Sequence, residues 1–295
     1  VIFGLPNEER LAALAEHSDG IKAIEVVGVF DQWPEFAAPL KKLRQGSDFE
    51  IYLHAVRPEV QGWTSTHGMH VDLTDEVDWV LSQADLKDAV DGFIFGSKSD
   101  MSPLDGYTAA RQCLAGTNYK PLLHVPSVGM FWSLADNDEA GENEELARVA
   151  EAIMVARANP DISVVIDNFV EIDRGYCSCL GLVDRLYNPK NGSRLVTSLN
   201  TLLPQRLSDL KSMQTSGGRV LSAEGDDGMV LLILPNEPQT ADSFTDNLPN
   251  DISDRQGVLV NLTDGEKTNT CLADVIEARA KEKTTRPPEL FLLKG

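Results

Sequence analysis

The chain has 295 residues, of which 42% are hydrophobic and 24% charged, and its 46 acidic residues outnumber its 26 basic ones, leaving a net charge of −20 at pH 7. These proportions are typical of a folded globular protein, while the negative charge disfavours nucleic acid and anionic membrane surfaces as partners. The longest apolar run, residues 229–234, is far shorter than the roughly 20 residues that a membrane helix needs.

Residues 1–205 alternate short apolar runs with longer amphipathic segments. In chain order, the runs predicted as strands are VIFGLP, IKAIEVVGVF, FEIYLHAV, DGFIFGS, KPLLHVPS and ISVVIDNF. Each is followed by a helical pattern, and apolar strands separated by such helices are typical of a parallel sheet covered by helices. The sequence therefore predicts the α/β class. The repeat of about 34 residues is close to that of a (β/α)8 TIM-like barrel.

Six units are two fewer than such a barrel contains, so we expect strands three to eight here and the first two units before Val1. Beyond residue 219 the pattern changes to the β-like runs RVLSAEG, DGMVLLILPN, GVLVNLTDG and ELFLLKG, with one helical stretch at 272–281. We predict a barrel domain at residues 1–211 and a C-terminal β-sandwich-like domain at residues 219–295. The small polar segment SMQTSGG, residues 212–218, is expected to link them.

Chemically rich side chains lie in and after the predicted strands, at the edge of a barrel where active sites are found. They are Asp31 and Trp33 after the second run, His54 and Arg57 in and after the third, Asp100 after the fourth, His124 and Trp132 in and after the fifth, and Asn168, Glu171 and Asp173 after the sixth. Carboxylates accept hydrogen bonds from sugar hydroxyls, and an indole face covers apolar C–H surface. The set therefore favours a neutral, polyhydroxylated ligand.

Structural interpretations of the same residues stay open. Asp31 and Asp100 are also typical of helix caps and turns. His54 and His124 lie inside apolar strands, where a hydrogen-bonded core histidine is as good an interpretation as a ligand contact. The carboxylates after the sixth run can instead hold their own loop by accepting backbone hydrogen bonds. The tryptophans of the loops favour a ligand platform.

The segment DNFVEIDRGYCSCLGLVDRLYNPKNGSRL, residues 167–195, resembles the last strand and helix of clan A glycoside hydrolase barrels. In those proteins a DNFEW-type strand tip is followed by Gly-Tyr, a GL(V)xD turn and an R…PK…S entry into the final helix. The matching positions are 167–169, Glu171, 175–176, 181–185, 189–190 and Ser193. The resemblance implies that Glu171 contacts substrate hydroxyls in the subsite where cleavage occurs.

A second run, EVVGVFD at residues 25–31, is similar to the fourth-strand EVWNEPD of the same clan. Gly28 and Val29 stand where the family has Asn-Glu, whose Glu is the general acid/base. His124 and Ser127 stand in KPLLHVPSVG, where the clan places a nucleophilic Glu. Neither family carboxylate is therefore matched.

The first functional hypothesis is a glycoside hydrolase-like, carbohydrate-active protein that cleaves or binds a neutral oligosaccharide or polysaccharide. Its catalytic candidates are Glu171, Asp31 and Asp100, one of which must keep a raised pKa to act as a general acid. The substrate-binding candidates are Trp33, His54, Arg57, His124, Trp132, Asn168 and Asp173. The alternative is a catalytically inactive barrel that binds glycan or supports an assembly. A barrel isomerase or aldolase using Lys98 or His124 is a third hypothesis.

Cofactor motifs are not found in the sequence. It has no GxGxxG, P-loop, HExxH or GxSxG motif, and its four cysteines form no Cys-x-x-Cys pair and lie at no metal-ligand spacing from a histidine. We therefore predict no cofactor and no metal. N-x-[ST] sequons at Asn191 and Asn261 slightly favour a secreted protein.

Overall fold

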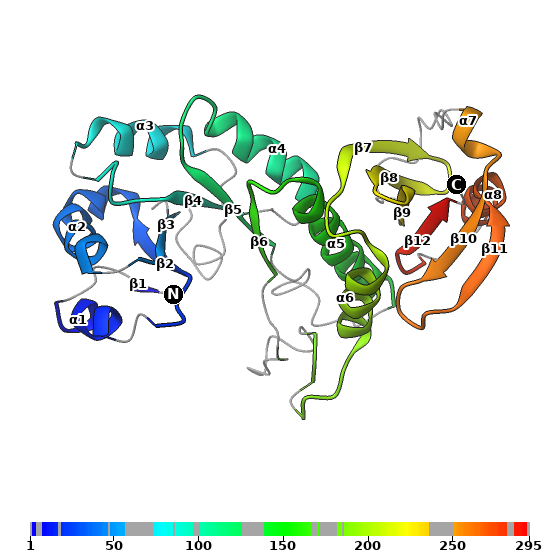
Figure 1. Ribbon diagram of the computed structural model, residues 1–295, viewed down its shortest axis with the longest axis horizontal. Coiled ribbons are helices and arrows are strands. Elements are labelled where there is room, and N and C mark those ends of the chain that lie inside the picture. Colours follow the sequence, from blue (N-terminus) through cyan, green and yellow to red (C-terminus); the bar gives the residue numbers. More distant parts are fainter. Residues whose placement is uncertain are drawn as a thin grey trace. The chain divides into compact units, whose positions relative to one another are not determined.

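The computed structural model describes residues 2–3, 8–16, 19–46, 48–56, 73–84, 86–96, 101–125, 139–166, 170, 182–184, 186–235, 250–281 and 286–293 (Figure 1). The chain divides into two compact units, Val1–Pro126 with Asp161–Val165, and Ser127–Pro160 with Ile166–Gly295. Among the helices of the described ranges, none combines the length and apolar character that crossing a membrane requires.

The first unit is built on a sheet whose strands lie side by side in chain order. They are β1 (Ile2–Phe3), β2 (Ala23–Val29), β3 (Glu50–Val56), β4 (Gly92–Gly96), β5 (Lys120–Val125) and β6 (Ser163–Ile166). Strands β1 to β5 pair in parallel. The predicted strands and the α/β class are therefore confirmed. A complete eight-stranded barrel is not, because the described part of this sheet has six strands.

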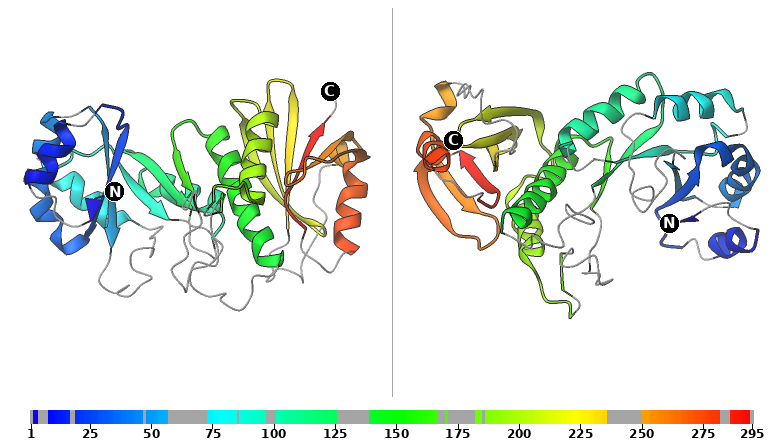
Figure 2. Two further views of the ribbon diagram at one scale, coloured as in Figure 1. Left: turned by 90° about the horizontal axis from the view of Figure 1, so that it is seen from below. Right: turned by 180° about the vertical axis from the view of Figure 1, so that it is seen from behind.

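Helices follow the strands, as the alternating pattern predicts. They are α1 (Glu8–Glu16), the 3-10 helix η1 (Phe30–Phe36), α2 (Ala37–Gly46), α3 (Thr74–Ser82) and α4 (Pro103–Cys113). Figures 1 and 2 show α1 and α2 together on one side of β2 and β3. Ser102 caps α4, since its hydroxyl accepts a hydrogen bond from the backbone N–H of Asp105 at 3.1 Å, directly before Pro103.

The second unit contains an antiparallel sheet in the order β11-β10-β12-β9-β8-β7. Its strands are β7 (Ser208–Thr215), β8 (Gly218–Gly225), β9 (Gly228–Leu234), β10 (Gln256–Asn261), β11 (Lys267–Cys271) and β12 (Glu289–Leu293). Its helices are α5 (Glu139–Ala158), α6 (Asn191–Leu202), α7 (Asn250–Ser253) and α8 (Leu272–Lys281). A β-rich C-terminal region is thus confirmed, as one sheet within the described residues; the second sheet that a sandwich requires is not seen among them.

Helices cover this sheet on both faces (Figure 2, left). Leu272 and Ile276 of α8 belong to one buried cluster with Leu231 of β9 and Phe291 of β12. On the opposite face the guanidinium of Arg219, from β8, binds the carboxylate of Glu151 from α5, with Nη1 to Oε1 at 3.0 Å. The sheet therefore lies between α8 and α5.

One sequence prediction about this region needs correction. Residues 212–218, predicted to be a linker, instead complete β7 and begin β8, and the hairpin turn ends at Gly218 with φ of +139°, a conformation that favours glycine. Helices α5 and α6 belong to the second compact unit. Helix α5 packs against the antiparallel sheet through the Arg219–Glu151 ion pair.

Candidate functional site

Four of the ten predicted site residues lie in the described part of the chain: Asp31, Trp33, His54 and His124. The other six are outside the described residues. They are Arg57, Asp100, Trp132, Asn168, Glu171 and Asp173. Asp31 is the second residue of η1, directly after β2, at the carboxyl end of a parallel strand as expected.

One face of the parallel sheet carries a group of polar side chains, which we call the polar face: Glu25, Tyr52, His54, Lys120 and His124. Glu25 pairs with Tyr52, which pairs with Gly92, which in turn pairs with Lys120. Side chains alternate between faces along a strand, so His54, two residues after Tyr52, and His124, four residues after Lys120, share this face. The sheet thereby brings both predicted histidines to one side.

Glu25 and His54 make a direct contact on the polar face. Nδ1 of His54 lies 2.5 Å from Oε1 of Glu25, and their side chains are 5% and 22% exposed. Burial acts to raise the pKa of Glu25, but the hydrogen bond to His54 and the electrostatic influence of His54 and His124 outweigh it and hold the pKa below its usual value. Glu25 is therefore an ionised hydrogen-bond acceptor near neutral pH.

Glu25 was not among the candidates that the sequence indicated. The available signal is a single carboxylate within the otherwise apolar run IEVVGVF, two residues before Val27 and therefore on the same face of the strand. Val27 pairs with His54 in the sheet. Only this strand register shows that Glu25 and His54 meet, and a sequence without pairing information does not contain it.

Trp33 corrects an expectation. It was predicted to be an exposed platform for a ligand, but its side chain is fully buried. The indole Nε1 donates a hydrogen bond to the carbonyl of Gly28 at 3.3 Å. The ring centroid lies 6.2 Å from that of Trp79 and 6.4 Å from that of Phe93. The ring therefore has no exposed face for a sugar and belongs to the core of the first unit.

Gly28 lies beneath this aromatic layer. A Cβ atom at Gly28 would stand 2.3 Å from the ring of Phe36 and 3.5 Å from Nε1 of Trp33. The Asn-Glu pair expected from the fourth-strand motif is thus replaced by a residue that must lack a side chain and by Val29, which pairs with Val56 at the end of the strand. Neither residue can transfer a proton.

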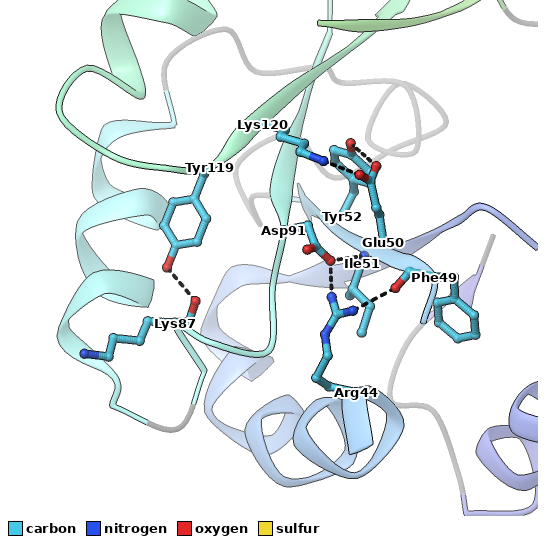
Figure 3. Close-up of polar contacts among 9 residues, drawn as sticks. All are labelled: Arg44, Phe49, Glu50, Ile51, Tyr52, Lys87, Asp91, Tyr119 and Lys120. Carbon is cyan, nitrogen blue, oxygen red and sulfur yellow. Dashed lines mark hydrogen bonds and ion pairs between the residues drawn. The ribbon is translucent and has the colours of Figure 1, made fainter. Parts of the chain in front are cut away.

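A second polar network lies where β3 and β5 begin (Figure 3). The Tyr52 hydroxyl donates to Oε2 of Glu50 at 2.7 Å, and Lys120 forms an ion pair with the other carboxylate oxygen of Glu50. Burial, followed by the hydrogen bond to Glu50, raises the pKa of Tyr52 above its usual range. The hydrogen bond from Lys120 is the main cause that lowers the pKa of Glu50.

Arg44 of α2 extends this network. It binds the carboxylate of Asp91 and donates to the carbonyl of Phe49 at 2.9 Å, while Asp91 also accepts from the backbone N–H of Ile51 at 2.8 Å (Figure 3). An open depression of about 800 Å³ lies beside it. It is lined by residues 19–22, 44–46 and 48–50. The network lies at the amino end of the strands and joins α2, β3 and β5 by hydrogen bonds and ion pairs, so we assign it to stability.

The described residues contain no candidate metal-binding site. Within the described ranges, no group of three or more His, Cys, Asp or Glu side chains is placed to hold a metal ion. His54 is the hydrogen-bonding partner of Glu25, and His124 acts on Glu25 electrostatically.

Comparison with known proteins identifies fold relatives among solved structures. No protein-family model matches the sequence, and no curated protein matches it. A glucosidase from Croceicoccus marinus is similar in fold, with a TM-score of 0.51 and 12% identity over 100% of this chain and 76% of the glucosidase. A GH5_18 enzyme from Bifidobacterium longum subsp. longum, crystallised with Manb1-4GlcNAc, gives a TM-score of 0.31 and 10% identity over 72% of this chain and 81% of its own. The first of these shows that the fold resembles that of a glycoside hydrolase.

Proposed function

We propose that this protein is carbohydrate-active and glycoside hydrolase-like, and that it binds a neutral oligosaccharide or polysaccharide at the carboxyl ends of the strands β2 to β6. The observation that carries the proposal is the likeness in fold to the glucosidase along the whole chain. The polar face supports it independently, because an ionised carboxylate and two histidines are groups that hydrogen-bond sugar hydroxyls.

We further propose that β1 to β6 correspond to strands three to eight of a (β/α)8 barrel in a domain of residues 1–211, with residues 219–295 as its C-terminal β domain. The order of the six strands follows the chain, as it does in such a barrel. Under this assignment, Asp31, Asp100 and the segment from Asn168 to Asp173 all follow strand ends at one edge of the sheet.

Catalysis, where it occurs, is assigned to the strand-end carboxylates Glu171, Asp31 and Asp100. Retaining hydrolysis needs two carboxyl groups about 5–5.5 Å apart and inversion needs roughly 6.5–9.5 Å. Glu25 does not suit the general acid role, because a general acid must hold its proton near neutral pH and the pKa of Glu25 is lowered. Arg57, Trp132, Asn168 and Asp173 are proposed to bind hydroxyls and ring faces around the cleavage point.

The second candidate is a catalytically inactive relative that binds glycan. The packing at Gly28 favours it, since Phe36 leaves no room for a side chain where the fourth-strand Asn of the clan stands, and Val29 replaces the acid/base. This candidate keeps the same binding edge and ligand class. It differs in predicting binding without turnover.

Hydrolysis and binding measured side by side separate these candidates. The full chain is incubated with cellotetraose, laminaritetraose, mannotetraose and xylotetraose, and reducing ends are followed by chromatography while affinity is measured by calorimetry. For an active hydrolase, Glu171→Gln should lower kcat by about 10²-fold or more, because it removes acid–base or nucleophilic chemistry. Glu224→Gln, an exposed carboxylate of β8, serves as the control and should leave the rate unchanged.

Each outcome decides a separate point. Binding with no release of reducing ends supports the inactive candidate. Undiminished hydrolysis by Glu171→Gln removes that residue from the mechanism. A chain that neither binds nor cleaves any of the four tetrasaccharides contradicts the proposed function itself.

A further inference from the structure

The contact between Glu25 and His54 gives the two nitrogens of the imidazole ring different roles. Nδ1 is committed to Oε1 of Glu25 at 2.5 Å. Nε2 has no hydrogen-bond partner in the part of the chain that the structure describes. Which nitrogen of a histidine carries the proton is set by the bond that the other one makes, so Glu25 fixes Nδ1–H and leaves Nε2 for another group.

We propose that this pair is a hydroxyl-recognition element, in which Nε2 of His54 contacts a sugar hydroxyl and Glu25 is the positioning residue behind it. The inference rests on the proposed carbohydrate function and adds the contact atom and the chemical group it takes. It assigns no proton transfer to either residue.

The chemistry of Nε2 selects a hydroxyl over other groups. With Nδ1–H held by Glu25, Nε2 accepts a hydrogen bond when the imidazole is neutral and donates one when it is protonated. An ammonium group suits only the first state and a carboxylate only the second. A hydroxyl both donates and accepts, so it is recognised in both states. The net charge of −20 further disfavours an anionic ligand.

The surroundings make the contact specific. His54 is 4% exposed, and on the same face Tyr52, Ile94 and Leu122 form a buried cluster. A hydrogen bond to a ligand is stronger in such surroundings than in water. His124, half-buried on the polar face, acts electrostatically on Glu25 and so favours the ionised carboxylate that holds Nδ1–H.

Two substitutions of His54 test the roles of Nδ1 and Nε2 one at a time. His54→Asn places an amide near the position of Nδ1, where it keeps a donor for Glu25 and removes the group at Nε2. His54→Gln extends an amide to the position of Nε2. The ligand is the one of the four tetrasaccharides that the wild type binds most tightly. We expect the Kd of His54→Asn to be about tenfold larger than that of the wild type, because one hydrogen bond is lost. His54→Gln should stay within about threefold of wild type, because its amide also donates and accepts.

A spectroscopic measurement on the wild type keeps the test independent of variant folding. Ring ¹⁵N resonances of His54 are followed during titration with the same tetrasaccharide, and Nε2 should shift at saturation while Nδ1 stays near its free value. Glu25→Gln should alter Nδ1 already in the free protein. If the wild type binds sugar but Nε2 does not respond, or both His54 variants bind as wild type, the inference is wrong while the proposed function stands. If the wild type binds none of the four, the proposed function fails and the inference falls with it.

Discussion

At the scale of single residues, strand β2 has a tightly packed glycine on one face of the sheet and a carboxylate that binds a histidine on the other. Gly28 lies under the rings of Phe36 and Trp33, where any side chain would collide with Phe36. Glu25, three residues earlier, contacts His54 on the polar face. The strand thus lacks the acid/base that its motif resemblance implies, and it supplies instead a carboxylate that orients an imidazole.

The ionised state of Glu25 makes a prediction about acid stability. Its pKa is lower in the folded protein than the ordinary value of 4.5, so its contribution to stability is complete above about pH 4.5 and is lost as pH falls through the folded pKa. Glu25→Gln should therefore lower the free energy of unfolding at pH 7, and the difference from wild type should shrink as the pH falls below about 4.5. Urea denaturation across this pH range measures it.

Glu277→Gln is the matched control for that experiment. Glu277 pairs with Lys281 on the surface of α8, and both side chains are mostly exposed. Solvent and salt screen such a pair, so the variant should unfold like wild type at each pH. A Glu25→Gln difference that stayed constant down to acid would contradict the assignment of an ionised, His-bonded Glu25.

At the scale of elements, the sequence predicts the strands of the parallel sheet and the central strands of the antiparallel sheet, but it misses the two edge strands of the antiparallel sheet. The central runs of both sheets carry continuous apolar residues, and each is a strand in the structure. The missed strands, β7 and β11, are the two edges of the antiparallel sheet and are largely exposed. Edge strands need few apolar residues and often carry polar ones, so SDLKSMQT and KTNTC give no strand signal, and the SMQTSGG hairpin reads as a linker.

The ion pair between α5 and β8 makes a prediction at the same scale. Arg219 and Glu151 are 11% and 1% exposed at their side chains. Arg219→Met removes the guanidinium that binds the buried carboxylate of Glu151, so it should lower the free energy of unfolding by about 3–5 kcal/mol. The double variant with Glu151→Leu should recover most of that loss, because no charge stays buried. Guanidinium denaturation monitored by circular dichroism measures both.

A surface ion pair provides the comparison. Arg111 and Asp161 are joined at 2.7 Å but are 57% and 40% exposed, so Arg111→Met should change the free energy of unfolding by less than about 1 kcal/mol. Equal losses from Arg219→Met and Arg111→Met would show that burial of the first pair does not determine its contribution.

At the scale of the whole molecule, composition and periodicity predict the α/β class, the strand sequence of the parallel sheet and a β-rich C-terminal region. The alternation of side chains along β3 and β5 also indicates the face on which His54 and His124 lie, but this prediction needs the pairing of the strands as well. Composition and periodicity do not predict the Glu25–His54 contact, because it depends on the register of β2 against β3, nor the burial of Trp33, which depends on η1 folding back over Gly28. Long-range pairing of this kind is absent from any local pattern.

The most direct test of a carbohydrate-active protein is a crystal structure of the full chain soaked with the tetrasaccharide that binds most tightly. We predict density for the sugar at the carboxyl ends of β2 to β6, with a hydroxyl within hydrogen-bond distance of Nε2 of His54. The separation of the carboxyl groups around the glycosidic bond would then tell hydrolysis from binding alone. Sugar bound against the antiparallel sheet, or at the depression beside Arg44 where the strands begin, would contradict the account.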